Sequence, residues 1–382
     1  MNIGIDGNEA NVEDRVGVNK YAFEMLWGLK KENEKKPKPN SLIVYLKNKP
    51  LFDLPKESNY FKYKVINGRG VWIITKFTPY LLKNPEKIDV LFSPSHYIPS
   101  FLAIPRICSV MDLGYIENTT QFEKMVLWQL KYWTAISVFA SKQVLTISEA
   151  SKNDIVRHYP FASNKVTVTH LGYDKDKFNL RVSNNLVRQL KNKYSIVEDY
   201  ILFVGTLKPS KNIEGLIDAY SLLTKDKTIL DIPQLVIAGK KGWMFDDIYK
   251  KVKDLNLTDK VIFTDFIKEE EKPTLIAGSK LFILPSFWEG FGLDILSAFG
   301  CGVPVIASNV GSLPEVTGKA AVLIDPNSIE SITNAIEKVL KMNKEEYNSL
   351  INLGFEQANK FSWENCSKKT LEVIENAIRQ KR

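Results

Sequence analysis

The residues best suited to bind a charged ligand lie in the segment PSFWEGFGLDILSAFGCGVPVIAS (285–308). A predicted strand ends there, and Gly290 and Gly292 form a turn that leads into a predicted helix over 293–299. Glycines ahead of a helix let backbone N–H groups approach an anion, and a helix N-terminus favours negative charge. The turn can therefore hold a phosphate, whereas the carboxylate of Glu289 would accept hydrogen bonds from hydroxyls such as those of a sugar. The alternative is a glycine-rich connection with Glu289 solvated.

Two further strand–loop–helix connections could face the same ligand. FVGTLKPSKNIEGLIDAY (203–220) places Lys208 and Lys211 in a loop ahead of a predicted helix, which suits a diphosphate, although the segment lacks the G-x-x-x-x-G-K-[ST] of a P-loop. In DGNEANVEDRVGVNKYAFEML (6–26), Gly17 precedes an amphipathic helix and would let the backbone approach a ligand. The alternatives are exposed loop lysines and a glycine that only starts a helix.

Short apolar runs rich in β-formers alternate with helical patterns along the whole chain, which predicts parallel sheets covered by helices. Strands are predicted at 2–6, 41–46, 63–67, 90–95, 106–112, 143–148 and 166–171, and then at 200–206, 234–239, 261–266, 281–286, 304–309 and 321–326. The polar, turn-rich segment 172–185 between the two sets is the best linker candidate. We therefore expect two doubly wound domains, with a ligand in the cleft that faces the carboxyl ends of both sheets.

Composition excludes several classes of protein. The 382 residues are 44% hydrophobic and 25% charged, which is typical of a globular chain of about two domains and not of a disordered or fibrous one. The three cysteines (Cys108, Cys301 and Cys366) are far apart, so neither a disulfide framework nor a cysteine zinc site is expected, and a reducing cytosol fits. No apolar run is long enough to span a membrane, and the N-terminus lacks the features of a signal peptide.

Positive charge is concentrated in the first half of the chain. Residues 1–177 hold 25 Lys and Arg against 18 Asp and Glu, a net +7, whereas residues 178–382 have a net +1. Such a surface suits membrane lipid, polyphosphate or nucleic acid, or simply keeps the protein in solution. In YFKYKVINGRGVWIITKFTPYLLK (60–83), aromatic and basic residues are interleaved. This stretch could bind an anionic membrane that presents a lipid-linked acceptor, or it could form a buried helix flanked by solvated lysines.

These segments together resemble the family-4 retaining glycosyltransferases, which have the GT-B fold. Over 203–326, FTDFIKEEEKPTLIAGSKLFILPSFWEGFGL, CGVPVIASNVGSLPEV and AAVLIDP follow in the family's order and spacing, and RVGVNKY, FSPSHYIP, VMDLGYI, LTISEASKNDI and VTHLGYD are similar to its N-terminal motifs. The resemblance implies two Rossmann-like doubly wound parallel-sheet domains. Residues 1–177 would bind the acceptor and 178–362 the nucleotide sugar, and a C-terminal helix at about 363–382 would cross back onto the first domain.

The function that the resemblance implies is a retaining, metal-independent hexosyltransferase. It would move a sugar from a nucleotide-diphosphate sugar (UDP, GDP or dTDP, not resolved) to a glycan or lipid-linked acceptor in cell-surface polysaccharide synthesis. It would need no cofactor and would act in the cytoplasm or at the inner face of the membrane. A phosphorylase, a nucleotide-sugar epimerase and a catalytically impaired nucleotide- or glycan-binding protein stay open. The missing G-x-G-x-x-G after the first strand disfavours a dehydrogenase, and nucleic-acid binding rests on charge alone.

The resemblance also assigns roles to single residues. Lys211 would bind the donor diphosphate and Glu289 the transferred sugar, and they are the expected catalytic residues together with Asp112. His96 and Asp112 are the acceptor candidates. The remaining donor-binding positions are Gly17, Thr206, Lys208, Phe266, Ile267, Gly290, Phe291, Gly292, Leu293 and Ser297, of which Phe266 and Ile267 would hold the base largely by backbone.

Three positions depart from the family's pattern. Ser297 stands where the family has a second glutamate that contacts the ribose, Thr206 where many members have an arginine, and Met111 where a histidine often precedes the aspartate. The sequence offers no convincing carboxylate pair for a double displacement, so a front-face substitution is expected. In such a reaction the protein orients the donor and the acceptor and stabilises the leaving diphosphate. The one Asp-x-Asp, at 174–176, lies in the expected linker, and no metal site is predicted.

Overall fold

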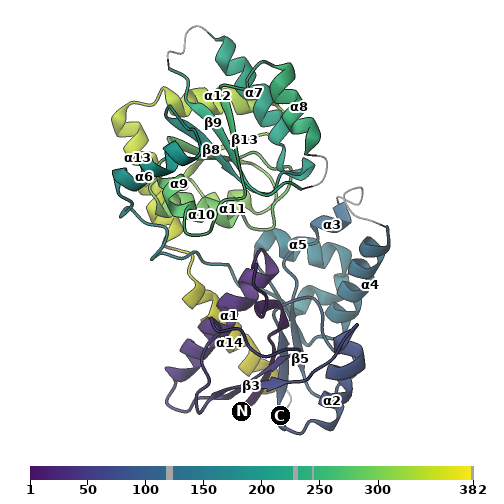
Figure 1. Ribbon diagram of the computed structural model, residues 1–382. Coiled ribbons are helices and arrows are strands. Elements are labelled where there is room, and N and C mark those ends of the chain that lie inside the picture. The colour runs from purple at the N-terminus through teal and green to yellow at the C-terminus, as the bar shows by residue number, and fades with distance from the viewer. Residues whose placement is uncertain (118–123, 227–230, 243–244, 380–382) are drawn as a thin grey trace. The chain divides into compact units, whose positions relative to one another are not determined.

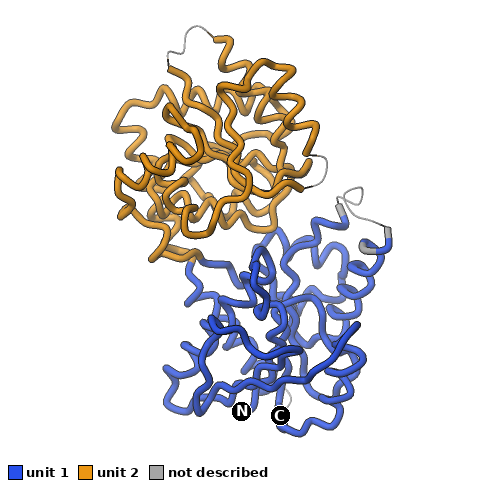
Figure 2. Tube along the Cα trace, in the orientation of Figure 1, with its two compact units in different colours: residues 1–172, 362–382 blue, residues 173–361 orange. Residues whose placement is uncertain are grey.

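The computed structural model describes residues 1–117, 124–226, 231–242 and 245–379, and the chain divides into two compact units (Figure 2). Unit 1 comprises Met1–Gly172 and Ser362–Arg382, and unit 2 comprises Tyr173–Phe361. The start of the expected linker packs against unit 2, because Phe178 is buried there and the ring of Tyr173 lies against Gly300. Unit 2 therefore begins at Tyr173, whereas the sequence analysis placed its start at residue 178.

Unit 1 contains, within the described residues, a seven-stranded parallel sheet in the order β3-β2-β1-β4-β5-β6-β7 (Figure 1). Its strands are β1 (Asn2–Asp6), β2 (Ser41–Leu46), β3 (Phe61–Val65), β4 (Val90–Ser93), β5 (Arg106–Ser109), β6 (Gln143–Thr146) and β7 (Val166–Val168). Its helices are α1 (Val18–Glu34), α2 (Thr78–Lys83), α3 (Gly114–Glu117), α4 (Lys124–Ala140), α5 (Glu149–His158) and α14 (Trp363–Arg379), with shorter turns η1 (Asn8–Ala10), η2 (Ile73–Phe77) and η4 (Pro160–Lys165).

Alternate residues of these strands face opposite layers of helices. Ile43, Leu91, Cys108 and Val144 join one hydrophobic cluster with side chains from η2, α2, α4 and α5. Phe61, Trp72 and Phe77 are buried, the last two with rings stacked at a centroid distance of 4.5 Å. These three aromatic side chains therefore serve the core, which favours the buried-helix alternative at their positions.

The C-terminal helix α14 belongs to unit 1 and runs alongside α1 (Figure 1). The two helices approach closely at Gly28, where an added Cβ would lie 1.9 Å from the Ser367 hydroxyl. Ion pairs of Lys35 with Glu364 at 2.5 Å and of Lys36 with Glu375 join the same elements. The predicted return of the last helix to the N-terminal domain is thus confirmed.

Unit 2 contains, in the part that the structure describes, a six-stranded parallel sheet in the order β10-β9-β8-β11-β12-β13. The strands are β8 (Tyr200–Val204), β9 (Gln234–Ala238), β10 (Val261–Asp265), β11 (Leu281–Leu284), β12 (Val305–Ser308) and β13 (Ala321–Ile324). The helices are α6 (Asn184–Lys193), α7 (Ile213–Lys225), α8 (Asp246–Asp254), α9 (Lys272–Ala277), α10 (Leu293–Gly300), α11 (Leu313–Thr317), α12 (Ile329–Leu340) and α13 (Lys344–Ala358), and the turn η5 (Pro209–Lys211) precedes α7.

Both sheets reverse their strand order at one place. In unit 1 the chain builds outward from β1 to β3 and then resumes at β4 on the other side of β1, and in unit 2 it does the same with β8 and β11. The loops after such a pair of strands run to opposite faces and open a crevice at the carboxyl edge of the sheet, where open α/β sheets bind ligands. The predicted fold class, two doubly wound parallel-sheet domains, is confirmed.

Candidate functional site

Lys211 and Glu289 meet at the carboxyl edge of the unit 2 sheet. Lys211 ends η5 after β8, Glu289 lies in the loop after β11, and their side chains form an ion pair with 17% and 14% of their surface exposed. The Ser286 hydroxyl donates to the same carboxylate oxygen at 2.7 Å. The carboxylate is thus oriented by a cation and a hydroxyl, while both charged groups keep access to a ligand.

Hydrogen bonds from neighbouring loops fix this pair. The backbone N–H of Phe287 donates to the Ser210 carbonyl at 2.9 Å, which joins the two loops directly. The N–H and the hydroxyl of Ser312 both donate to the Glu289 carbonyl, at 3.2 and 3.0 Å. A Cβ at Gly311, whose φ is 56°, would lie 2.7 Å from that carbonyl. The sequence analysis assigned no role to these positions, although a glycine soon after β12 at the same sheet edge was a usable signal.

The turn at Gly290–Gly292 delivers the start of α10 to the same edge. Gly292 is the N-cap residue with φ 87° and ψ 52°, and the first turn of a helix leaves backbone N–H groups without intrahelical partners. The Phe291 side chain is buried against Phe361, with ring centroids 5.7 Å apart, so only its backbone can meet a ligand. The site therefore combines one cation, one carboxylate and a helix N-terminus, which suits a diphosphate joined to a hydroxyl-bearing group.

Replacing Gly292 by alanine should lower both stability and donor affinity. A Cβ there would lie 2.7 Å from Leu313 Cδ2, and the positive φ disfavours any residue but glycine. We expect unfolding free energy to fall by about 1–3 kcal/mol and nucleoside-diphosphate affinity to fall roughly tenfold or more, measured by thermal unfolding and calorimetry. Gly302→Ala, at the other end of α10 with φ 71°, is the control and should lower stability only. Equal donor affinity in both variants would contradict a ligand at the N-terminus of α10.

The other predicted donor positions line the same sheet edge with different accessibility. Phe266, after β10, is 52% exposed and carries the Lys240 ammonium 4.6 Å from its ring centroid, whereas the Ile267 side chain is buried. Thr206 is exposed after β8. Lys208 lines a cavity of about 230 Å³ that Asn212 and Phe287 also line.

Ser297 offers little to a ligand. Its side chain is buried, and its hydroxyl donates back to the Leu293 carbonyl within α10 at 3.4 Å. One turn earlier, Asp294 forms an ion pair with Lys272 of α9 at 2.5 Å. The structure thus provides no carboxylate at position 297, in agreement with the departure noted in the sequence.

Gly17, His96 and Asp112 follow β1, β4 and β5, which are neighbours in the unit 1 sheet. Gly17 is the exposed N-cap of α1 with φ 54°, and nothing lies within 4 Å of an added Cβ, so the backbone is open to a ligand. His96 Nε2 is buried and has no hydrogen-bond partner among the described residues, and burial lowers its pKa to about 4. Asp112 accepts a hydrogen bond from the Gly114 N–H at 2.9 Å at the start of α3.

Asp6 and Glu9, which the sequence analysis did not single out, lie in the same region. Asp6 ends β1 and accepts hydrogen bonds from the Asn8 backbone and side chain, at 3.1 and 2.7 Å. Burial nevertheless raises the pKa of Asp6 to about 6. Burial also raises the pKa of Glu9, whose carboxylate accepts a hydrogen bond from Asn19 at 2.7 Å. The sequence alone does not show that these two carboxylates are buried, so it did not identify them as site residues.

The raised pKa of Asp6 predicts a stability that falls with pH. The folded state binds the proton more tightly than the unfolded chain, whose ordinary value is 3.8, so this stabilisation is complete below about pH 4 and is lost as pH rises through 6. Relative to Asp6→Asn, the wild type should lose up to about 3 kcal/mol of unfolding free energy over that interval in urea titrations. Asp53→Asn is the control: Arg15 lowers the pKa of Asp53, so its effect has the opposite sign. A pH profile that Asp6→Asn leaves unchanged would contradict this prediction.

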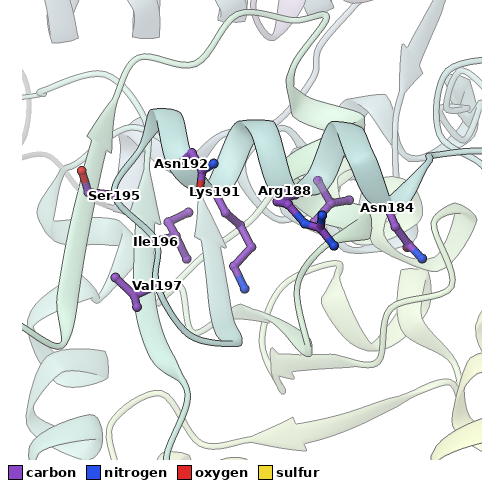
Figure 3. A pocket seen from close by; sticks show the side chains of 8 residues that line it. Asn184, Arg188, Lys191, Asn192, Ser195, Ile196 and Val197 are labelled. Carbon is purple, nitrogen blue, oxygen red and sulfur yellow. The ribbon is translucent and has the colours of Figure 1, made fainter.

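A separate cavity of about 650 Å³ lies along α6 (Figure 3). Its walls come from α6 and the segment that follows, and include Arg188, Lys191 and Ser195. Figure 3 shows the Arg188 and Lys191 side chains extending from one side of α6. None of the predicted site residues lines this cavity, which has a basic wall but no carboxylate.

Neither a metal-binding cluster nor a membrane-spanning helix occurs among the described residues. No group of three or more histidine, cysteine, aspartate or glutamate side chains in these ranges could hold a metal ion. No helix among them combines the length and apolar character that crossing a membrane requires.

Comparison with known proteins connects this geometry to a family. Residues 188–357 match the family Glycosyl transferases group 1. The chain is 29% identical over 344 residues to O-antigen chain mannosyltransferase B of Escherichia coli, covering 89% of this chain and 84% of that protein. It is 31% identical over 269 residues to a serotype-specific mannosyltransferase of the same organism, of which it covers only 33%.

Solved structures share the fold along the whole chain. Sucrose-phosphate synthase from Thermosynechococcus elongatus superimposes with a TM-score of 0.76 at 18% identity and covers 100% of both chains. The Anabaena protein HepE, solved in complex with UDP-glucose, gives a TM-score of 0.74 at 17% identity and covers 98% of this chain and 100% of its own. At these identities the likeness concerns the fold alone.

Proposed function

We propose that the chain, whose residues 188–357 match Glycosyl transferases group 1 and whose fold is GT-B, is a glycosyltransferase that transfers a mannosyl residue from a nucleoside-diphosphate sugar to a glycan acceptor during synthesis of a cell-surface polysaccharide. The observation that carries the donor class is the Lys211–Glu289 pair beside the N-terminus of α10. The sugar and the polysaccharide are inferred from relatives named as O-antigen mannosyltransferases. None of the relatives reported above is named as a phosphorylase or an epimerase, so those reactions are not favoured.

In this proposal the donor lies across the β8–β11 crevice of unit 2. Lys211 and the first N–H groups of α10 bind the diphosphate, and Glu289 accepts hydrogen bonds from the hydroxyls of the sugar. The exposed ring of Phe266 and the backbone at Ile267 hold the base. These contacts to the diphosphate and the sugar hold the anomeric carbon in position for attack by the acceptor hydroxyl.

We propose a retaining front-face substitution. The acceptor hydroxyl oxygen bonds to the anomeric carbon on the face from which the diphosphate departs, the bond from that carbon to the diphosphate oxygen breaks, and the acceptor proton passes to the leaving diphosphate. In this proposal Glu289 is the carboxylate that faces the sugar. Because it forms an ion pair with Lys211, it is better suited to orienting the sugar than to attacking the anomeric carbon as a nucleophile. Lys211 and α10 supply the positive potential for the leaving group, so neither a metal ion nor a cofactor is part of the proposal.

The acceptor is proposed to bind at the β1–β4 crevice of unit 1. His96 is neutral near pH 7 because burial lowers its pKa to about 4. Its buried, unpartnered Nε2 would take a hydrogen bond from an acceptor hydroxyl once the groups that cover it move aside. The open backbone at Gly17 adds a second contact. Asp112, which already orients the start of α3, is a positioning residue here. A lipid-linked acceptor would bring the enzyme to the cytoplasmic face of an anionic membrane, and this contact is part of the proposal.

A donor panel tests the function. UDP-, GDP- and dTDP-linked mannose and glucose are each incubated with a mannan-type acceptor, and nucleoside-diphosphate release and glycan products are measured, with Lys211→Ala alongside. Release from one mannose donor, with elongated product and none in the variant, is the expected result. Release without elongation, or no release from any donor despite nucleoside-diphosphate binding, would contradict transfer to a glycan.

A further inference from the structure

The outward face of α4 carries a continuous row of large apolar side chains. Between 43% and 80% of the surface of each is exposed, and the members are Met125, Trp128, Tyr132, Ile136 and Phe139. They are three or four residues apart, so they share one face of the helix, while Thr134, Ser137 and Val138 are buried on the other. We call this row the α4 stripe. Single exposed apolar residues are ordinary, but a row of five along one helix marks an interaction surface.

The helix layer that contains the α4 stripe also carries basic side chains. Neither α4 nor the segment 68–83, which contains η2 and α2, has an aspartate or glutamate. Both elements contribute to the hydrophobic cluster on one face of the unit 1 sheet, so they belong to the same layer. Arg69, Lys76 and Lys83 are exposed in that layer and form no ion pair with any described residue.

We propose that the α4 stripe inserts into the interface of an anionic lipid bilayer, with Arg69, Lys76 and Lys83 against the headgroups. Tryptophan, tyrosine and phenylalanine on one face of a helix suit the boundary between headgroups and acyl chains. Lysine and arginine side chains in the same helix layer, which form no ion pair with a described residue, add attraction to anionic lipid. A second copy of this chain fits less well, because a symmetric contact would bring the basic margins of both copies together.

This inference deepens the membrane contact proposed above and rests on that part of the function. It replaces the aromatic residues of 60–83, which are largely buried, with those of α4. A helix that lies in the interface needs neither the length nor the uniform hydrophobicity of a spanning helix. It would also hold the acceptor crevice of unit 1 near a lipid-linked glycan.

Vesicle flotation with the full chain tests the proposal. The vesicles contain phosphatidylethanolamine with phosphatidylglycerol, or phosphatidylcholine alone. Trp128→Gln/Phe139→Gln should lower the partition coefficient on anionic vesicles at least about tenfold. Lys76→Gln/Lys83→Gln should lower it roughly tenfold and weaken its salt dependence. Phe52→Gln/Val197→Gln, at side chains 98% and 82% exposed elsewhere, is the control and should bind as the wild type does.

The outcomes separate this inference from the donor site. All variants should keep the melting temperature and the donor turnover of the wild type with a water-soluble acceptor. No binding of the wild type to anionic vesicles, or equal loss in the control, would overturn the lipid surface alone. Self-association in solution that the Trp128→Gln/Phe139→Gln variant abolishes, without vesicle binding, would assign the stripe to a second copy. Intact vesicle binding with no turnover would instead count against the proposed function.

Discussion

Lys211→Ala is expected to lower glycosyl transfer about 10²–10³-fold and to weaken nucleoside-diphosphate binding at least tenfold. The ammonium at position 211 is held at the carboxyl edge of the sheet beside the N-terminus of α10, so its loss removes the cation that the leaving diphosphate needs. The measurements are kcat/KM for nucleoside-diphosphate release and calorimetric titration with the product nucleotide. Lys211→Arg keeps the charge and should retain more activity than the alanine variant.

The matched control is Lys251→Ala. Lys251 is also partly buried in unit 2 and pairs with Asp218 at 2.6 Å, away from the predicted donor residues. Its removal should change transfer less than twofold or so, because a partly exposed ion pair contributes little. Full activity in Lys211→Ala would contradict the proposed donor site. So would an equal loss in Lys251→Ala, since the effect would then reflect folding and not the diphosphate.

Glu289→Gln is expected to separate turnover from nucleotide binding. An amide cannot replace the carboxylate as a strong acceptor for the sugar hydroxyls, so kcat should fall about 10²–10³-fold. Nucleoside-diphosphate affinity should stay the same or rise several-fold, because Lys211 then loses the anion that competes with the diphosphate. Steady-state kinetics and calorimetry on one preparation measure both.

The control for this variant is Glu337→Gln in α12, where the carboxylate forms an ion pair with Lys341 on the surface of unit 2. It should leave kcat and nucleotide affinity near those of the wild type. If Glu289→Gln weakened nucleotide binding as strongly as turnover, the carboxylate would act by holding the loop after β11, through its bond with Ser286, and not by contacting the sugar.

The fold could largely be predicted because buried parallel strands are continuous apolar runs. YILFV and LFIL are buried at every position, and each of the thirteen predicted strands has a counterpart among the described residues. Their ends were less accurate. The run 106–112 stays apolar beyond Ser109, where β5 ends, since hydropathy reports burial and not ladder hydrogen bonds. On the edge strand β3, Lys62 and Lys64 point outward and shifted the predicted start from residue 61 to 63.

The site was predictable one loop at a time, but its pairing was not. Lys211 and Glu289 are 78 positions apart, and their ion pair depends on β8 and β11 being neighbours. Nor could the sequence show which face of an irregular helix packs against the core. The π-helical turn η2 departs from the α-helical period, and both Trp72, just before it, and Phe77, at its end, face the core. That is why the interleaved pattern of 60–83 left both a membrane surface and a buried helix open, whereas the structure buries Trp72 and Phe77.

The most direct test of the donor site is a crystal structure with the nucleoside diphosphate that the donor panel selects. We predict the β-phosphate within hydrogen-bond distance of Lys211 Nζ and of the first N–H groups of α10, with the base beside Phe266. A diphosphate bound instead at the α6 cavity, against Arg188 and Lys191 and out of reach of Lys211, would contradict the assignment on which the proposed transfer rests.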